Sequence, residues 1–145
     1  MLDNNELEKN VAKAISLYYP GDITHLDIKA NKGWIYLEGF VSSMEKRNSI
    51  QDIALNVFGT CVIINKITIV PTGKSEDISI ADKIIDTIDS NVELNVDKII
   101  IEVRDHVVKM TGKVPNFLTK QLAYNVASGV ENIRTIENQL KVMGK

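Results

Sequence analysis

The sequence predicts an α+β protein built from two tandem αββαβ units, each a three-stranded mixed sheet with two helices on one face. The first observation behind this prediction is an internal repeat, because sliding the 145-residue chain on itself by 73 residues aligns its halves without a gap. The second is that the spacing of apolar residues changes from helical to alternating in the same order in both halves. Identical residues at this shift include Ile15 with Ile88, Ile28 with Ile101, Gly39 with Gly112 and Asn65 with Asn138.

Each half begins with an amphipathic helix. Leu7, Val11 and Ile15 recur at helical spacing in the first half, and Pro20 then ends the helix. The matching apolar residues of the second half are Ile80, Ile84, Ile85 and Ile88. Both helices therefore offer one apolar face to a sheet.

A β-hairpin with one buried face follows each helix. Apolar and polar residues alternate on both sides of a turn, at Asn31-Lys32-Gly33 in the first half and Arg104-Asp105-His106 in the second. We interpret His106, which takes the place of Gly33, as a structural residue, because histidine tolerates a positive φ angle better than most residues. Gly112, inside the second strand, is expected to tolerate substitution poorly because such a glycine marks the close approach of a neighbour.

A second helix and a closing strand complete each half. Ser42 followed by Glu45 fits a capping box at the start of the first of these helices, and the counterpart helix begins at Pro115-Asn116. Gly129 stands where the first half has Asn56, and we expect these two residues to end their helices in the left-handed conformation. The closing strands are predicted over residues 62–69 and 133–142.

The boundary between the halves follows from composition. The segment 71–75 is short and consists of polar and helix-breaking residues, which is typical of a linker. We therefore expect a first domain at residues 1–70, a linker at 71–77 and a second domain at 78–145.

Composition limits the classes of function. The chain has 17 Lys and Arg against 19 Asp and Glu, a net charge of -2, so it lacks the basic footprint of a nucleic-acid binder. No stretch approaches the ~20 apolar residues that cross a bilayer, and we expect a soluble chain. The single cysteine, Cys61, excludes an intramolecular disulfide.

Several motifs recur at corresponding places in the two halves. The second strand of each hairpin carries an apolar-x-Gly-x-Val pattern, at Leu37-Glu38-Gly39-Phe40-Val41 and at Met110-Thr111-Gly112-Lys113-Val114. Asn65 and Asn138 precede the closing apolar residues, and Gly129-Val130 ends the last helix. With the αββαβ order, these motifs resemble the BON domain, as a tandem pair over nearly the whole chain.

The resemblance implies a non-enzymatic module. BON domains occur in bacterial osmotic-shock and envelope proteins, where they are thought to bind phospholipids or associate with membranes. Most periplasmic members begin with an export signal, and this sequence has none. We therefore expect a periplasmic protein if the chain is a mature fragment, and a cytoplasmic one if Met1 is the native start.

The residues offer no catalytic or metal-binding constellation, so we predict no catalytic residue, no metal site and no cofactor. His25 and His106 do not correspond at the 73-residue shift. The KH type of RNA module shares the αββαβ order but needs a Gly-x-x-Gly loop, which is missing here, and we expect no nucleic-acid partner. The acidic residues Asp82, Asp86, Asp89 and Glu93 are interpreted as a solvated helix face.

The candidate binding site is the start of the last helix. Phe117, Leu118 and Leu122 lie close together there, and Lys113 and Lys120 flank them. An apolar helix end beside lysines suits contact with a membrane surface or a protein partner. The competing interpretation is that these residues close an interface between the two copies.

A second apolar surface is predicted on the first hairpin. Trp34, Tyr36 and Phe40 alternate with the core residues of their strand, so we expect them to face outward or toward another domain.

The function that these features favour is a non-enzymatic binding module of the bacterial envelope or of a stress response, with phospholipid as its ligand. The alternative is a cytoplasmic protein-protein adaptor or small-ligand sensor in a stress response. The sequence leaves the oligomeric state open.

Overall fold

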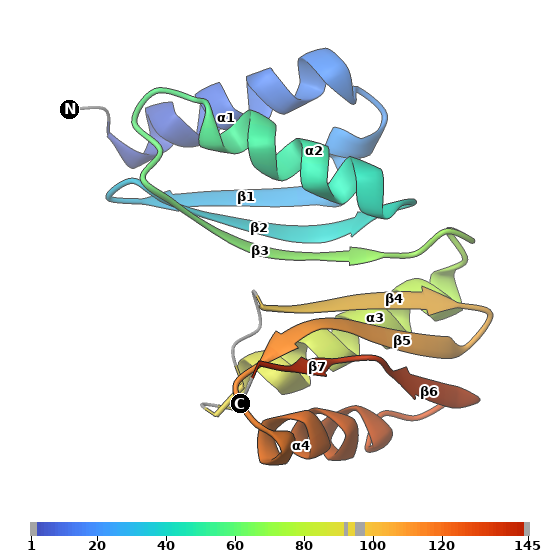
Figure 1. Ribbon diagram of the computed structural model, residues 1–145. Helices are drawn as coiled ribbons and strands as arrows, with labels where there is room; N and C mark the ends of the chain where they lie inside the picture. Colours follow the sequence, from blue (N-terminus) through green and yellow to red (C-terminus); the bar gives the residue numbers. More distant parts are fainter. Residues whose placement is uncertain (1–2, 92, 95–97, 144–145) are drawn as a thin grey trace. The chain divides into compact units, whose positions relative to one another are not determined.

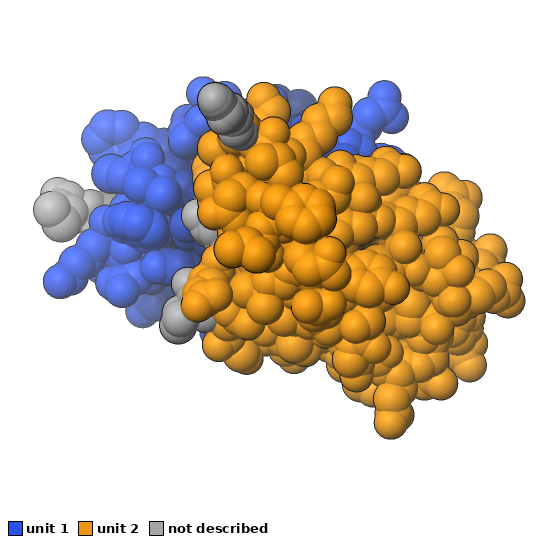
Figure 2. All heavy atoms as spheres, turned by 60° about the horizontal axis from the view of Figure 1, so that its bottom comes forward, with its two compact units in different colours: residues 1–67 blue, residues 68–145 orange. Residues whose placement is uncertain are grey.

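The computed structural model of the chain describes residues 3–91, 93–94 and 98–143. The chain divides into two compact units, residues 1–67 and 68–145, which Figure 2 distinguishes by colour. The αββαβ order occurs twice along it, so the predicted α+β fold with two tandem units is confirmed.

The first αββαβ copy is a three-stranded sheet with two helices on one face (Figure 1). Its elements are α1 (Asn4–Tyr18), the short 3-10 helix η1 (Asp22–His25), β1 (Leu26–Asn31), β2 (Trp34–Val41), α2 (Met44–Leu55) and β3 (Val62–Ile69). β1 pairs antiparallel with β2, and β3 lies on the other side of β2. Between the helices and the sheet lies a core that includes Leu7, Val11, Ile15, Ile35, Leu37, Val41, Ile50, Ala54 and Ile67.

The second copy repeats this arrangement. Its elements are α3 (Ser75–Asp89), β4 (Ile99–Arg104), β5 (Val107–Val114), α4 (Phe117–Ser128), β6 (Thr135–Asn138) and β7 (Lys141–Val142). β4 pairs antiparallel with β5, and β6 pairs parallel with the other side of β5. The buried residues of β4 and β5 alternate, so one face of the sheet meets the helices.

Strand register confirms the internal repeat. Ile28 pairs with Leu37 in the first hairpin, and Ile101 pairs with Met110 in the second. Each of these residues lies 73 positions from its counterpart, so the two hairpins have the same register.

The last strand of the second copy differs from the prediction. We expected one strand over residues 133–142, but the structure has the two short strands β6 and β7, and both pair with β5. Between these two strands, the Asn138 side-chain oxygen accepts the N–H of Leu140 at 3.3 Å. Asn65 makes the same bond to the N–H of Ile67 at 2.9 Å, which explains why an asparagine occurs at this place in both copies.

The helix starts differ by one residue from the prediction. Ser43, and not Ser42, caps α2, because Ser43 is extended (φ -151°) and its hydroxyl accepts the N–H of Lys46 at 3.2 Å. The prediction of a capping box formed by Ser42 and Glu45 is therefore wrong. The counterpart of Ser43 is Asn116, which caps α4 in the same way.

The helix ends also correct the prediction. Asn56 and Gly129 are right-handed, with φ angles of -84° and -77°. The Gly129 N–H donates to the carbonyl of Val126, so the last turn tightens instead of reversing. The chain reverses three residues later, where Gly59 and Asn132 have positive φ angles of 100° and 71°.

Candidate functional site

The first turn of α4 exposes two large apolar side chains. Phe117 is 64% exposed and Leu118 is 78% exposed, so neither belongs to the core. They come directly after the cap residue Asn116, whose side-chain oxygen accepts the N–H of Thr119 at 2.8 Å and fixes the start of the helix. The residues by which α4 packs on its sheet are the small Ala123 and Ala127.

The other predicted site residues lie around this turn with different exposure. Leu122 is half-buried and shares a surface hollow with Leu118. Lys120 is also half-buried, and its backbone carbonyl accepts the side-chain N–H of Asn138 at 3.1 Å. Lys113 is exposed at the end of β5. The structure therefore brings the two leucines into one hollow, and the two lysines and Phe117 are not among the residues that line it.

The hollow is open and measures about 600 Å³. Its lining residues are Glu93, Asn116, Leu118, Thr119, Gln121, Leu122 and Asn125. Glu93 is the charged member of this lining. Apolar side chains among mostly uncharged polar ones suit a contact with an apolar group, and no catalytic pair is formed by these lining residues.

The acidic stripe of the second copy is exposed. Asp82, Asp86 and Asp89 lie on the outer face of α3, and Glu93 follows that helix. In the part of the chain that the structure describes, no three His, Cys, Asp or Glu residues are placed to hold a metal ion.

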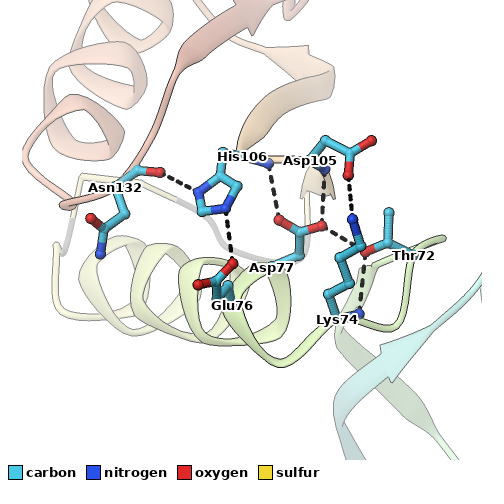
Figure 3. A network of polar contacts seen from close by, with 7 residues as sticks. All are labelled: Thr72, Lys74, Glu76, Asp77, Asp105, His106 and Asn132. Carbon is cyan, nitrogen blue, oxygen red and sulfur yellow. Dashed lines mark hydrogen bonds and ion pairs between the residues drawn. The ribbon is translucent and has the colours of Figure 1, made fainter.

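A polar network ties α3 to the turn between β4 and β5 (Figure 3). At its centre, the carboxylate of Asp77 is fully buried and accepts the N–H groups of Asp105 and His106, each at 2.9 Å. The hydroxyl of Thr72 donates to the same carboxylate at 2.6 Å, and Lys74 forms an ion pair with Asp105 at 3.0 Å.

Burial acts to raise the pKa of Asp77. The hydrogen bonds from Thr72 and from the backbone of His106 and Asp105 outweigh this effect, so the pKa of Asp77 lies below its ordinary value. The carboxylate is therefore ionised at neutral pH and serves as the acceptor that holds the turn.

Sequence reasoning missed Asp77, although a signal was present. At the 73-residue shift Asp77 falls on Asn4, which lies in the first turn of α1. The Asn4 side-chain oxygen accepts the N–H of Lys32, the counterpart of Asp105, at 2.9 Å. A polar acceptor in the first turn of the first helix therefore holds the hairpin turn in both copies.

The BON domain matches the chain twice, over residues 3–71 and again over residues 76–144. The chain belongs to the BON-domain family. The first match spans a complete αββαβ unit, and the second begins at the second residue of α3 and spans the rest of its unit. BON domains are non-catalytic binding modules. A search of curated proteins finds no match.

Solved structures that match the chain include two determinations of CdsD, a structural protein of the type III secretion system of Chlamydia trachomatis. One, its C-terminal domain, is 11% identical, with a TM-score of 0.41, and the match covers 98% of this chain and 68% of that one. The other is 12% identical, with a TM-score of 0.40, and the match covers 99% of this chain and 65% of that one. Within the described residues of the tandem BON protein, no helix is both long and apolar enough to cross a bilayer.

Proposed function

We propose that the tandem BON protein binds the surface of phospholipid membranes of the bacterial envelope, and that the first turn of α4 is the contact. The observation that carries this proposal is the exposure of Phe117 and Leu118, at 64% and 78%, next to each other at a helix end. Adjacent exposed large apolar residues at a helix start are suited to enter the boundary between head groups and acyl chains.

Charge supports a contact in which the apolar area dominates. α4 carries no acidic residue, and Lys120 and Lys113 lie on α4 and at the end of β5. Glu93 lines the same hollow as Leu118 and opposes the lysines at an anionic surface. Each apolar side chain that is buried contributes roughly 1.5 to 3 kcal/mol, against about 1 kcal/mol for each lysine near anionic lipid.

The test is flotation of the purified chain with vesicles of phosphatidylglycerol and phosphatidylcholine, compared with phosphatidylcholine alone. We expect Phe117→Ser with Leu118→Ser to lower retention on the anionic vesicles at least about tenfold, because the two apolar side chains that enter the membrane are lost. High salt should weaken retention only partly, since salt screens the lysines and not the apolar contact.

The matched control is Leu55→Ser with Phe58→Ser, which removes two apolar side chains that are 50% and 86% exposed elsewhere, at the end of α2. This control should be retained like the wild-type chain. Equal retention of the wild-type chain and the α4 variant, with both folded by circular dichroism, would contradict the proposal.

A protein or small-molecule partner is the second candidate, and the hollow beside Leu118 favours it. An open space of about 600 Å³, lined by two leucines, four uncharged polar residues and Glu93, would accept an apolar group of a partner. Such an adaptor or sensor role predicts no retention on either kind of vesicle, so the flotation experiment separates the two functions.

A further inference from the structure

The imidazole of His106 lies between two acceptors from different parts of the second unit (Figure 3). Its Nδ1 is 2.8 Å from the backbone carbonyl oxygen of Asn132, in the loop between α4 and β6. Its Nε2 is 3.2 Å from Oε1 of Glu76, in the first turn of α3. One side chain on the β4–β5 turn therefore reaches two other segments.

The chemistry of the two partners selects one protonation state of the ring. A backbone carbonyl can only accept a hydrogen bond, and the ionised carboxylate of Glu76 can only accept one as well. Neutral imidazole has a single N–H, so it can satisfy one of these partners but leaves a lone pair facing the other. Only imidazolium, with two N–H groups, satisfies both.

The surroundings of the ring also favour its charged form. The hydrogen bond to the Asn132 carbonyl, followed by the bond to Glu76, raises the pKa of His106 above its ordinary value of 6.5. The ionisable groups around the ring are Glu76, Asp77 and Lys83 of α3, Glu131 of the loop after α4, Asp105 of its own turn, and Lys74 and Arg134. Four of these are acidic and three basic.

The backbone of His106 is held independently of the ring. Its N–H donates to Asp77 at 2.9 Å, and its carbonyl accepts the N–H of Arg134 at 2.7 Å. The first copy has the counterpart of the bond to Arg134, since the carbonyl of Gly33 accepts the N–H of Cys61 at 2.7 Å. Gly33 has no side chain. The imidazole is therefore an addition to a turn that the first copy forms without it.

We propose that His106 is a proton-operated clamp that joins the β4–β5 turn to α3 and to the α4–β6 loop when its ring is protonated. When the ring loses a proton, Nδ1 stays protonated, because it donates the 2.8 Å bond to the Asn132 carbonyl. Nε2 then presents a lone pair to the Glu76 carboxylate, and the contact with α3 opens. The backbone bonds stay, so the response is confined to the clamp and its two partner segments.

The sign of the pH effect follows from the raised pKa. Protonation is favoured in the folded state, so the clamp stabilises the second unit fully below pH 6.5, and this stabilisation is lost as pH rises through the higher pKa of the folded state. We therefore expect the second unit to lose stability as the pH rises from mildly acidic to alkaline values.

The experiment is an NMR titration of the full chain from pH 5 to 9, with ring resonances assigned by comparison with His106→Gly. This variant is safe for folding, because His106 has a φ of 67° and the first copy has Gly33 at the equivalent place. We expect the His106 ring to titrate with a midpoint above 6.5, and the midpoint to fall in Glu76→Gln. The amide signals of Glu76 and of residues 131–134 should move with that same midpoint in the wild-type chain.

Thermal melting over the same pH range provides the second measurement. The wild-type chain should lose stability relative to His106→Gly as the ring deprotonates. The control is Lys83→Gln, which changes a charged residue of α3 near the ring but neither of the ring's two hydrogen bonds, and it should keep the wild-type response. A His106 midpoint at or below 6.5, a midpoint unchanged in Glu76→Gln, or silent amides at residues 131–134 would each overturn the clamp.

Discussion

At the residue scale, two glycines occupy corresponding positions at which each αββαβ copy has no room for a side chain. Gly39 and Gly112 have φ angles of 124° and 127°, a region that residues with a side chain rarely adopt. A Cβ at Gly39 would collide with the carbonyl oxygen of His25, and one at Gly112 would collide with that of Lys98. The two colliding residues are themselves 73 positions apart, so the close approach is repeated with the fold.

We therefore predict that Gly112→Ala destabilises the chain by at least about 2 kcal/mol, because it adds both backbone strain and a collision. The measurement is urea unfolding followed by circular dichroism. Gly21→Ala is the control, since a Cβ there meets nothing within 4 Å and its φ of -75° is ordinary. Equal losses in the two variants would show that Gly112 has no special role.

At the scale of elements, a buried arginine joins α2 to β3. Arg47 is only 4% exposed, and its guanidinium donates to the carbonyl oxygens of Ile67 at 2.8 Å and Asn65 at 3.1 Å. The side chain of Asn65 also donates to Gln51 of α2 at 2.9 Å. Polar groups, and not apolar packing alone, thus set the distance between helix and strand.

Arg47→Met should destabilise the first unit by about 2 to 4 kcal/mol, because it leaves two buried carbonyl groups without these donors. Trp34 is the single tryptophan of the chain and lies in this unit, so its fluorescence can follow urea unfolding there. Lys29→Met is the control within the same unit, because the Lys29 side chain is 69% exposed and should contribute less than about 1 kcal/mol. A similar midpoint for both variants would argue against a structural role for the buried guanidinium.

At the scale of the whole molecule, each unit exposes apolar residues at the same end of its helix pair. The two helices of each unit run antiparallel, so the end of the first helix lies beside the start of the second (Figure 1). In the second unit the exposed pair is Phe117 and Leu118, from the start of α4. In the first unit it is Leu17 and Tyr18, 74% and 70% exposed, from the end of α1.

This arrangement predicts a role for the first unit in membrane contact. Leu17→Ser with Tyr18→Ser should lower retention on anionic vesicles at least about threefold, a smaller loss than in the α4 variant because the Tyr18 ring carries a polar hydroxyl. Leu55→Ser with Phe58→Ser again serves as the control. Unchanged retention would contradict this prediction and leave the first unit as a support for the second.

Local patterns were sufficient to determine the repeat, the order of the elements and the core faces. The 73-residue shift is read by comparing the two halves of the sequence, and the change of apolar period is a property of neighbouring residues. Together they predict which side of each strand is buried. They also indicated the close approach at Gly112, because a glycine within an apolar strand pattern usually marks a place where another backbone segment comes near.

Only the tertiary structure decided which polar groups meet and which apolar residues remain exposed. Asp77 and His106 are 29 positions apart, and the partners of His106 are 30 and 26 positions away from it, so the local spacing of apolar residues does not join them. The exposed pairs Leu17–Tyr18 and Phe117–Leu118 come from different helices of the repeat, so the shift that reveals the fold does not align them. Hydrogen bonding and exposure depend on the packing of distant segments, and the sequence by itself specifies only the local preferences of each segment.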